Sequence, residues 1–140
     1  MGEEVHQITP DNWNRMMDIN VTTLLNTTRS VIPAMIERGR GIIVTIGARP
    51  SLEGKKKMGS YSAAKAAVLR LTESIAAEGS STRLRARCII PGTIDTPDNR
   101  RLMPKADTSK WIKPETIANV IVETCFNNSL TEKDVIVSLY

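Results

Sequence analysis

Aromatic side chains are scarce in this 140-residue sequence, which has one phenylalanine, two tyrosines and two tryptophans. Its core must therefore be aliphatic, built from Ile, Val, Leu, Ala and Met. The scarcity also argues against a nucleic-acid partner, because such a protein needs stacking rings or a known binding module beside its basic face. The net charge of +4 comes from basic clusters that we interpret as solvated surface: GKKK at 54–57, RLRAR at 83–87 and NRR at 99–101.

Cysteine and histidine are almost absent as well. Cys88 and Cys125 lie far apart, which favours reduced, buried thiols over a disulfide framework, and the single His6 gives no metal-ligand cluster. No apolar run approaches the roughly 20 residues of a membrane span, and the first residues, MGEEVHQ, do not resemble a signal peptide. We expect a cytoplasmic protein of one domain, residues 1–140, with no metal and no membrane association.

Helical and strand patterns alternate along the chain. Thr9 is a predicted N-cap with Pro10 at the first helical position. The predicted elements are a helix at 10–38, a strand at 41–48, a helix at 60–78, a strand at 83–92, a helix at 113–128 and a strand at 134–140. This alternation predicts an α/β fold with three parallel strands and helices on both faces, part of a Rossmann-like, doubly wound domain.

The helix at 60–78 begins with a tyrosine and a lysine four residues apart. Tyr61 and Lys65 should share one helical face near the carboxyl end of the sheet, where ligands bind in open α/β folds. A phenol is a weak acid at neutral pH, but a nearby ammonium lowers its pKa and makes proton exchange with an alcohol or carbonyl oxygen feasible. By itself the pair is weak evidence, and an aromatic ring beside a solvated amine is the favoured interpretation.

Two further stretches contain candidate site residues. IIPGTIDTP ends a buried strand with Pro91 and Gly92, and then offers the backbone of Ile94 and the hydroxyl of Thr96 to an amide or a phosphate. The alternative is an ordinary turn that ends the strand. Asn20 lies inside a helical pattern, where asparagine competes for backbone hydrogen bonds, so it either faces solvent or makes a polar contact inside the protein.

The chain resembles the second half of the short-chain dehydrogenases/reductases in four consecutive segments: NVTTLLNTTRSVIPAM, GIIVTIGA, YSAAK with AAVLRLTESIAAE, and PGTIDTP. The resemblance covers nearly the whole chain. It implies an oxidoreductase that uses NAD or NADP and acts on a small-molecule carbonyl/alcohol pair. It also implies a homo-oligomer, either a dimer or a tetramer, and it makes the stretch 97–112 similar to the family's mobile substrate-binding loop.

The same resemblance implies roles for the candidate residues. Tyr61 would be the catalytic acid/base. Lys65 would lower the pKa of that tyrosine and, with it, contact the nicotinamide ribose. Asn20 would support a water-mediated proton relay to Lys65. The segment that would hold the nicotinamide carboxamide consists of Pro91, Gly92, Ile94 and Thr96.

Two features depart from the family pattern. The serine that holds the substrate oxygen is replaced by Ala48, and loss of such a donor typically costs about a hundredfold or more in rate. Ser51 could substitute for it only if the loop bends back. The glycine-rich turn that binds the pyrophosphate, and the residue that selects NAD or NADP, have no counterpart here. We therefore expect the lone chain to bind a dinucleotide weakly, if at all.

The missing half would leave the strand at 41–48 with an exposed apolar edge, which invites pairing with another chain. We expect a second copy or the N-terminal segment to cover it. Three functions stay open: an oxidoreductase completed by another polypeptide, a truncated non-catalytic oligomerisation or interaction module, and, ranked well below these, nucleic-acid binding. The absent glycine-rich turn favours the module. The retained Asn20, Tyr61, Lys65 and Thr96 favour the enzyme, or a recent truncation that has not yet lost them.

Overall fold

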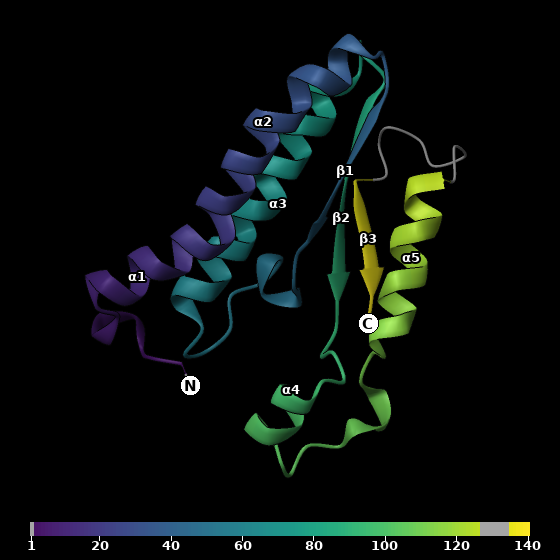
Figure 1. The fold of residues 1–140 in the computed structure, drawn as a ribbon. Coiled ribbons are helices and arrows are strands. Elements are labelled where there is room, and N and C mark those ends of the chain that lie inside the picture. The colour runs from purple at the N-terminus through teal and green to yellow at the C-terminus, as the bar shows by residue number, and fades with distance from the viewer. Residues whose placement is uncertain (1, 127–134) are drawn as a thin grey trace.

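The computed structural model describes residues 2–126 and 135–140 (Figure 1). Its strands and longer helices follow the predicted alternation, with a π-helix between the first two helices. In chain order they are α1 (Pro10–Met17), the π-helix (Asp18–Thr22), α2 (Thr23–Glu37), β1 (Gly41–Ile46), α3 (Gly59–Gly79), β2 (Leu84–Pro91), α4 (Pro97–Leu102), α5 (Pro114–Phe126) and β3 (Ile136–Leu139).

The three strands form one parallel sheet in the order β1-β2-β3. The register pairs Gly41 of β1 with Leu84 of β2, and Cys88 of β2 with Ile136 of β3. Helices α2 and α3 lie on one side of the sheet and α5 lies on the other (Figure 1). The predicted fold class is therefore confirmed. The arrowheads of β2 and β3 point toward the end of the sheet that lies near α4, and β1 runs parallel to them.

The sequence pattern predicts one unbroken helix at 10–38, but in the structure this helix is interrupted. It begins as predicted, because the Asn12 N–H donates to the Thr9 hydroxyl at 3.2 Å. The π-helix then interrupts it, and the Asn20 side-chain amide donates to the Met16 carbonyl at 3.0 Å. In a regular α-helix the Asn20 backbone N–H would bond that same carbonyl, so the side chain competes with the helical ladder.

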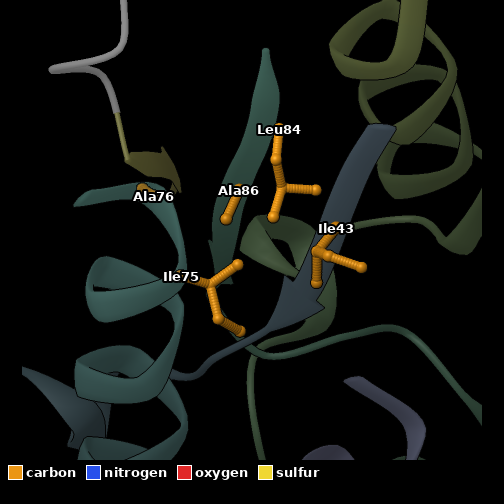
Figure 2. Close-up of a cluster of buried hydrophobic side chains, with 5 residues drawn as sticks. All are labelled: Ile43, Ile75, Ala76, Leu84 and Ala86. Carbon is orange, nitrogen blue, oxygen red and sulfur yellow. The ribbon is translucent and has the colours of Figure 1, made fainter. Parts of the chain in front are cut away.

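The hydrophobic core lies between α3 and the sheet and is aliphatic, as the composition predicts. Two side chains of α3 face side chains of β1 and β2 in the first cluster, which Figure 2 shows as Ile43, Ile75, Ala76, Leu84 and Ala86. A second cluster, formed by Leu69, Cys88 and Ile90, continues it toward the carboxyl end of β2. Burial of these side chains fixes α3 against the central strand, and so fixes the residues at the start of α3.

One part of the charge interpretation is wrong. Arg87, in the cluster RLRAR, is only 1% exposed. Its strand, β2, is flanked by β1 and β3 and has helices on both sides, so an alternating pattern does not place a residue in solvent there. Its neighbour Arg85 is half-buried and donates to the Cys125 carbonyl at 3.2 Å. Both cysteines are free, and Cys88 is fully buried.

The stretch between β2 and α5 is less irregular than its sequence suggests. It contains α4 and a parallel bridge between Ile94 and Ile112, with the Ile112 N–H donating to the Thr93 carbonyl at 2.8 Å. The predicted end of the helix at 113–128 and the predicted start of the last strand fall on 127–134, outside the described residues. Across the described ranges, no helix is long and apolar enough to cross a membrane.

Candidate active site

A cleft of about 1110 Å³ opens where β1 and β2 end. It brings together residues from α3, from the turn after β1 and from the segment after β2. Of the residues that the sequence singled out, it is lined by Ala48, Tyr61, Lys65, Pro91, Gly92 and Ile94. A parallel sheet positions them so, because the carboxyl ends of its strands meet at one edge.

Tyr61 and Lys65 lie one turn apart at the start of α3. The Lys65 ammonium is 5.9 Å from the centroid of the Tyr61 ring. It donates a hydrogen bond of 3.0 Å to the carbonyl of Ile46, the last residue of β1. This bond ties the lysine to the end of the strand. An ammonium has three donors, so two remain for a ligand.

Burial sets the acid–base properties of this pair. It raises the pKa of the Tyr61 phenol above the ordinary value of 10.0. This direction is opposite to the one that the sequence predicts from the neighbouring ammonium. Burial also lowers the pKa of Lys65, an effect that the nearby Cys88 thiol partly opposes. Near neutral pH the phenol therefore carries its proton.

Titration of Tyr61 should be visible in the difference between the wild type and Tyr61→Phe. We expect the phenolate absorbance lost in the variant to develop above pH 10.0. Because the folded-state pKa is raised, the stability that the neutral phenol contributes is complete below pH 10 and is lost as the pH rises through the folded value. Tyr140→Phe should leave that high-pH step in place. A Tyr61 step at or below pH 10 would contradict the burial argument.

Asn20 is half-buried and makes the internal polar contact that was one of its two predicted alternatives. It does not line the main cleft. It lines a neighbouring cavity of about 270 Å³ between the π-helix, α2 and β1, and Lys65 lines both spaces. The asparagine is therefore connected to the cleft through Lys65.

The residues after β2 have different structural roles. Gly92 and Ile94 line the cleft, and the Gly92 N–H donates to the Leu139 carbonyl of β3 at 2.7 Å. The Thr96 hydroxyl instead caps α4 by accepting from the Asn99 N–H at 3.2 Å. Asn99, which sequence reasoning missed, lines the cleft and donates its amide to the Ile94 carbonyl at 2.8 Å. The capping spacing from Thr96 was the available signal.

Ala48 stands where the family has a serine, and Ser51 is the nearby hydroxyl that could have replaced it. Ala48 lines the cleft, but its side chain has no donor. Ser51 is 6% exposed, and its hydroxyl donates to the Ala48 carbonyl at 2.5 Å. The loop does bend back, but the Ser51 hydroxyl holds the backbone of the turn and does not replace the lost side chain.

Four basic side chains that the sequence did not select also line the cleft. They come from α1, from the turn after β1 and from the loop before α3, and they are Arg15, Arg49, Lys55 and Lys57. No local pattern could predict this grouping, because Arg15 precedes the others by more than one complete element. It is the fold that brings them to one place.

Comparison with known proteins gives consistent matches. The family model described as short chain dehydrogenase matches residues 1–107. Acetoacetyl-CoA reductase of Shinella zoogloeoides is 34% identical over 126 residues, which cover 84% of this chain and 52% of that protein. An inactive 2-(S)-hydroxypropyl-CoM dehydrogenase of Xanthobacter autotrophicus is 34% identical over 114 residues, covering 81% and 50%.

The fold is also found among solved structures. L-Sorbose reductase from Gluconobacter frateurii, in complex with NADPH and L-sorbose, matches with a TM-score of 0.84. The match covers 99% of this chain and 60% of that one at 20% identity. The chain spans about half the length of the curated relatives it matches.

Proposed function

Because the chain belongs to the short-chain dehydrogenase family, we propose that it carries the acid–base site of an oxidoreductase that interconverts a carbonyl compound and an alcohol with NAD or NADP. The observation that carries this proposal is one cleft lined by both Tyr61 and Lys65, with the lysine tied to Ile46 at the end of β1. The substrate would be a small molecule.

The residues present fit the nicotinamide end of such a cofactor. Lys65 has two remaining donors for ribose hydroxyls, the Tyr61 hydroxyl is beside it, and the backbone from Pro91 to Ile94 offers polar groups for a carboxamide. When bound, the nicotinamide supplies or accepts a hydride. A glycine-rich turn for the pyrophosphate is not found in the sequence, so these residues give no hold on the adenosine end.

Tyr61 exchanges a proton with the substrate oxygen. In the reducing direction its hydroxyl donates to the substrate oxygen, and the Lys65 ammonium stabilises the phenolate that is left behind. The cavity shared by Lys65 and Asn20, at about 270 Å³, has room for water, so a proton can return by this path. Asn20 would orient that water. The Thr96 hydroxyl accepts from the Asn99 N–H at the start of α4 and keeps its own O–H, which could still donate to a carboxamide.

The test is calorimetric titration of the whole chain with NADH and with NADPH, followed by turnover of carbonyl substrates. Micromolar binding of either cofactor and turnover that depends on Tyr61 would support the proposal. An absence of binding at millimolar concentrations of both would retire it for this chain.

Ala48→Ser should restore a donor for the substrate oxygen. Ala48 lines the cleft, so we expect the serine to raise kcat by about a hundredfold, the lower end of the typical contribution of one oxyanion-type donor. The measurement is steady-state turnover of the same carbonyl substrate. Ala118→Ser is the matched control and should leave kcat unchanged, because Ala118 is exposed on α5 and does not line the cleft. An unchanged kcat in Ala48→Ser would show that this part of the cleft lining does not contact the reacting oxygen.

A non-catalytic oligomerisation or interaction module is the second candidate. One observation favours it: β1 lies at the sheet edge, and within the described ranges it pairs only with β2. The N-terminal residues, which we expected as one possible cover, are not part of this sheet. We propose that a second copy covers the edge and that the protein is a homo-oligomer. The cofactor titration separates the two functions, because a module needs neither NADH nor NADPH.

A further inference from the structure

The charged side chains of the candidate cleft are mainly of one sign. Its lining contains a single carboxylate, Glu3, and five cations: Arg15, Arg49, Lys55, Lys57 and Lys65. The Glu3 carboxylate accepts from the Asn12 amide at 2.8 Å. The cleft as a whole therefore has a positive potential, and a concave surface strengthens such a field.

Two of these cations already interact within the protein. The Lys55 ammonium pairs with Glu53 at 2.9 Å, and the Arg49 guanidinium lies 4.8 Å from the centroid of the Tyr140 ring. Both side chains are exposed, so these internal interactions are weak. They reduce the contribution of Lys55 and Arg49 to ligand binding but do not remove it.

Arg15 and Lys57 are exposed as well, but they differ from these two cations in their interactions. Over the part of the chain that the structure describes, neither one takes part in an ion pair. Arg15 comes from α1 and Lys57 from the loop that precedes α3, so the fold supplies them from two separate segments. A charged side chain that lines a cleft and has no ion-pair partner can bind a ligand of opposite charge without first breaking an internal bond.

The remaining lining is largely apolar. The apolar side chains come from α1, the π-helix, the loop before α3 and the region of α4, and they are Met16, Ile19, Met58, Leu102 and Met103. Unbranched methionine side chains adapt to ligands of different shape. A ligand that matches this surface has a flexible apolar chain and an anionic group.

We propose that the substrate of this site is an aliphatic carbonyl compound with an anionic group, a carboxylate or a phosphate, which Arg15 and Lys57 bind while the carbonyl lies at Tyr61. The proposal names the substrate class of the oxidoreductase proposed above and rests on that function. Its charge recognition is separate from the chemistry, because neither Arg15 nor Lys57 exchanges a proton with the substrate.

Binding without cofactor and without turnover tests the charge recognition alone. The carboxylate arm compares 3-oxohexanoate with 3-oxohexanamide, and the phosphate arm compares 4-oxopentyl phosphate with 5-hydroxypentan-2-one, by ligand-observed NMR on the full chain. We expect the anion of at least one arm to bind about tenfold more tightly than its neutral partner, with the preference shrinking as salt is added. The arm with the larger preference identifies the anionic group.

Matched variants assign the preference to these two residues. In the double variant Arg15→Gln/Lys57→Gln the preference should disappear. The double variant Arg29→Gln/Lys56→Gln removes the same charge from exposed residues outside the cleft lining and should keep it. Equal affinity for the anionic and neutral probes in both arms, or the same loss in both double variants, would overturn the proposal.

Two further results separate the possible failures. If Arg15→Gln/Lys57→Gln weakens nicotinamide mononucleotide as much as the anionic ketones, the two cations serve a cofactor phosphate and the substrate proposal is overturned. An anion preference that is lost only in this variant, with no turnover by any preparation, would support the anion subsite and refute the oxidoreductase. Turnover of neutral and anionic ketones with equal kcat/KM would support the oxidoreductase and refute the anion subsite.

Discussion

Replacement of Tyr61 by phenylalanine is expected to lower kcat by about 10²- to 10⁴-fold, the range for loss of a positioned proton donor. The variant keeps the ring that is half-buried at the start of α3 and loses only the hydroxyl. The Lys65 bond to the Ile46 carbonyl does not involve that hydroxyl, so the cleft should keep its shape. The loss should therefore appear in kcat, with thermal unfolding little changed.

Tyr140→Phe is the matched control for this prediction. Tyr140 is the chain's other tyrosine, is 60% exposed and does not line the cleft. A phenylalanine there keeps the ring that faces Arg49, and kcat should stay at the wild-type value. Steady-state rates at saturating cofactor make the comparison. A Tyr61→Phe enzyme with more than about a tenth of wild-type kcat would rule out Tyr61 as the main proton donor.

Leu69→Ala is expected to lower the free energy of unfolding by about 2–5 kcal/mol, the range for a large-to-small change in a core. Leu69 is 0% exposed and packs from α3 onto Cys88 and Ile90 of the central strand. The cost combines lost burial of the side chain with the cavity left beside a strand that is held by neighbours on both sides.

Leu52→Ala gives the comparison for that variant, because Leu52 is 46% exposed in the loop after β1. We expect its unfolding free energy to change by less than about 0.5 kcal/mol. Urea unfolding followed by circular dichroism measures both. Similar losses in the two variants would mean that the contact of α3 with β2 is not the main source of stability.

Some of the site could be predicted because its signals are local. The four-residue spacing of Tyr61 and Lys65 places both on one helical face whatever the helix packs against. Thr9 and Pro10 begin a helix because a side-chain cap and a fixed backbone angle act within one turn. The order of strands and helices likewise predicted a parallel sheet.

Other features could not be predicted because they depend on competition between contacts. The Asn20 side chain competes with the backbone for the Met16 carbonyl, and a π-helix results where the pattern predicted an unbroken helix. Ser51 and Thr96 both have hydroxyls that could have served a ligand. In the fold they bond the Ala48 carbonyl and the Asn99 N–H.

The sequence by itself determined the α/β class, the start of the first helix and the placement of Tyr61 and Lys65 on one helical face, since each follows from interactions between residues close in the chain. Only the tertiary structure decided that Arg87 is buried and that Arg15 and Lys57 line the same cleft as Tyr61. Burial and cleft lining are set by which elements pack together. A basic residue has the same local signature whether the fold covers it, leaves it in solvent or places it in the lining of the same cleft as Tyr61 and Lys65.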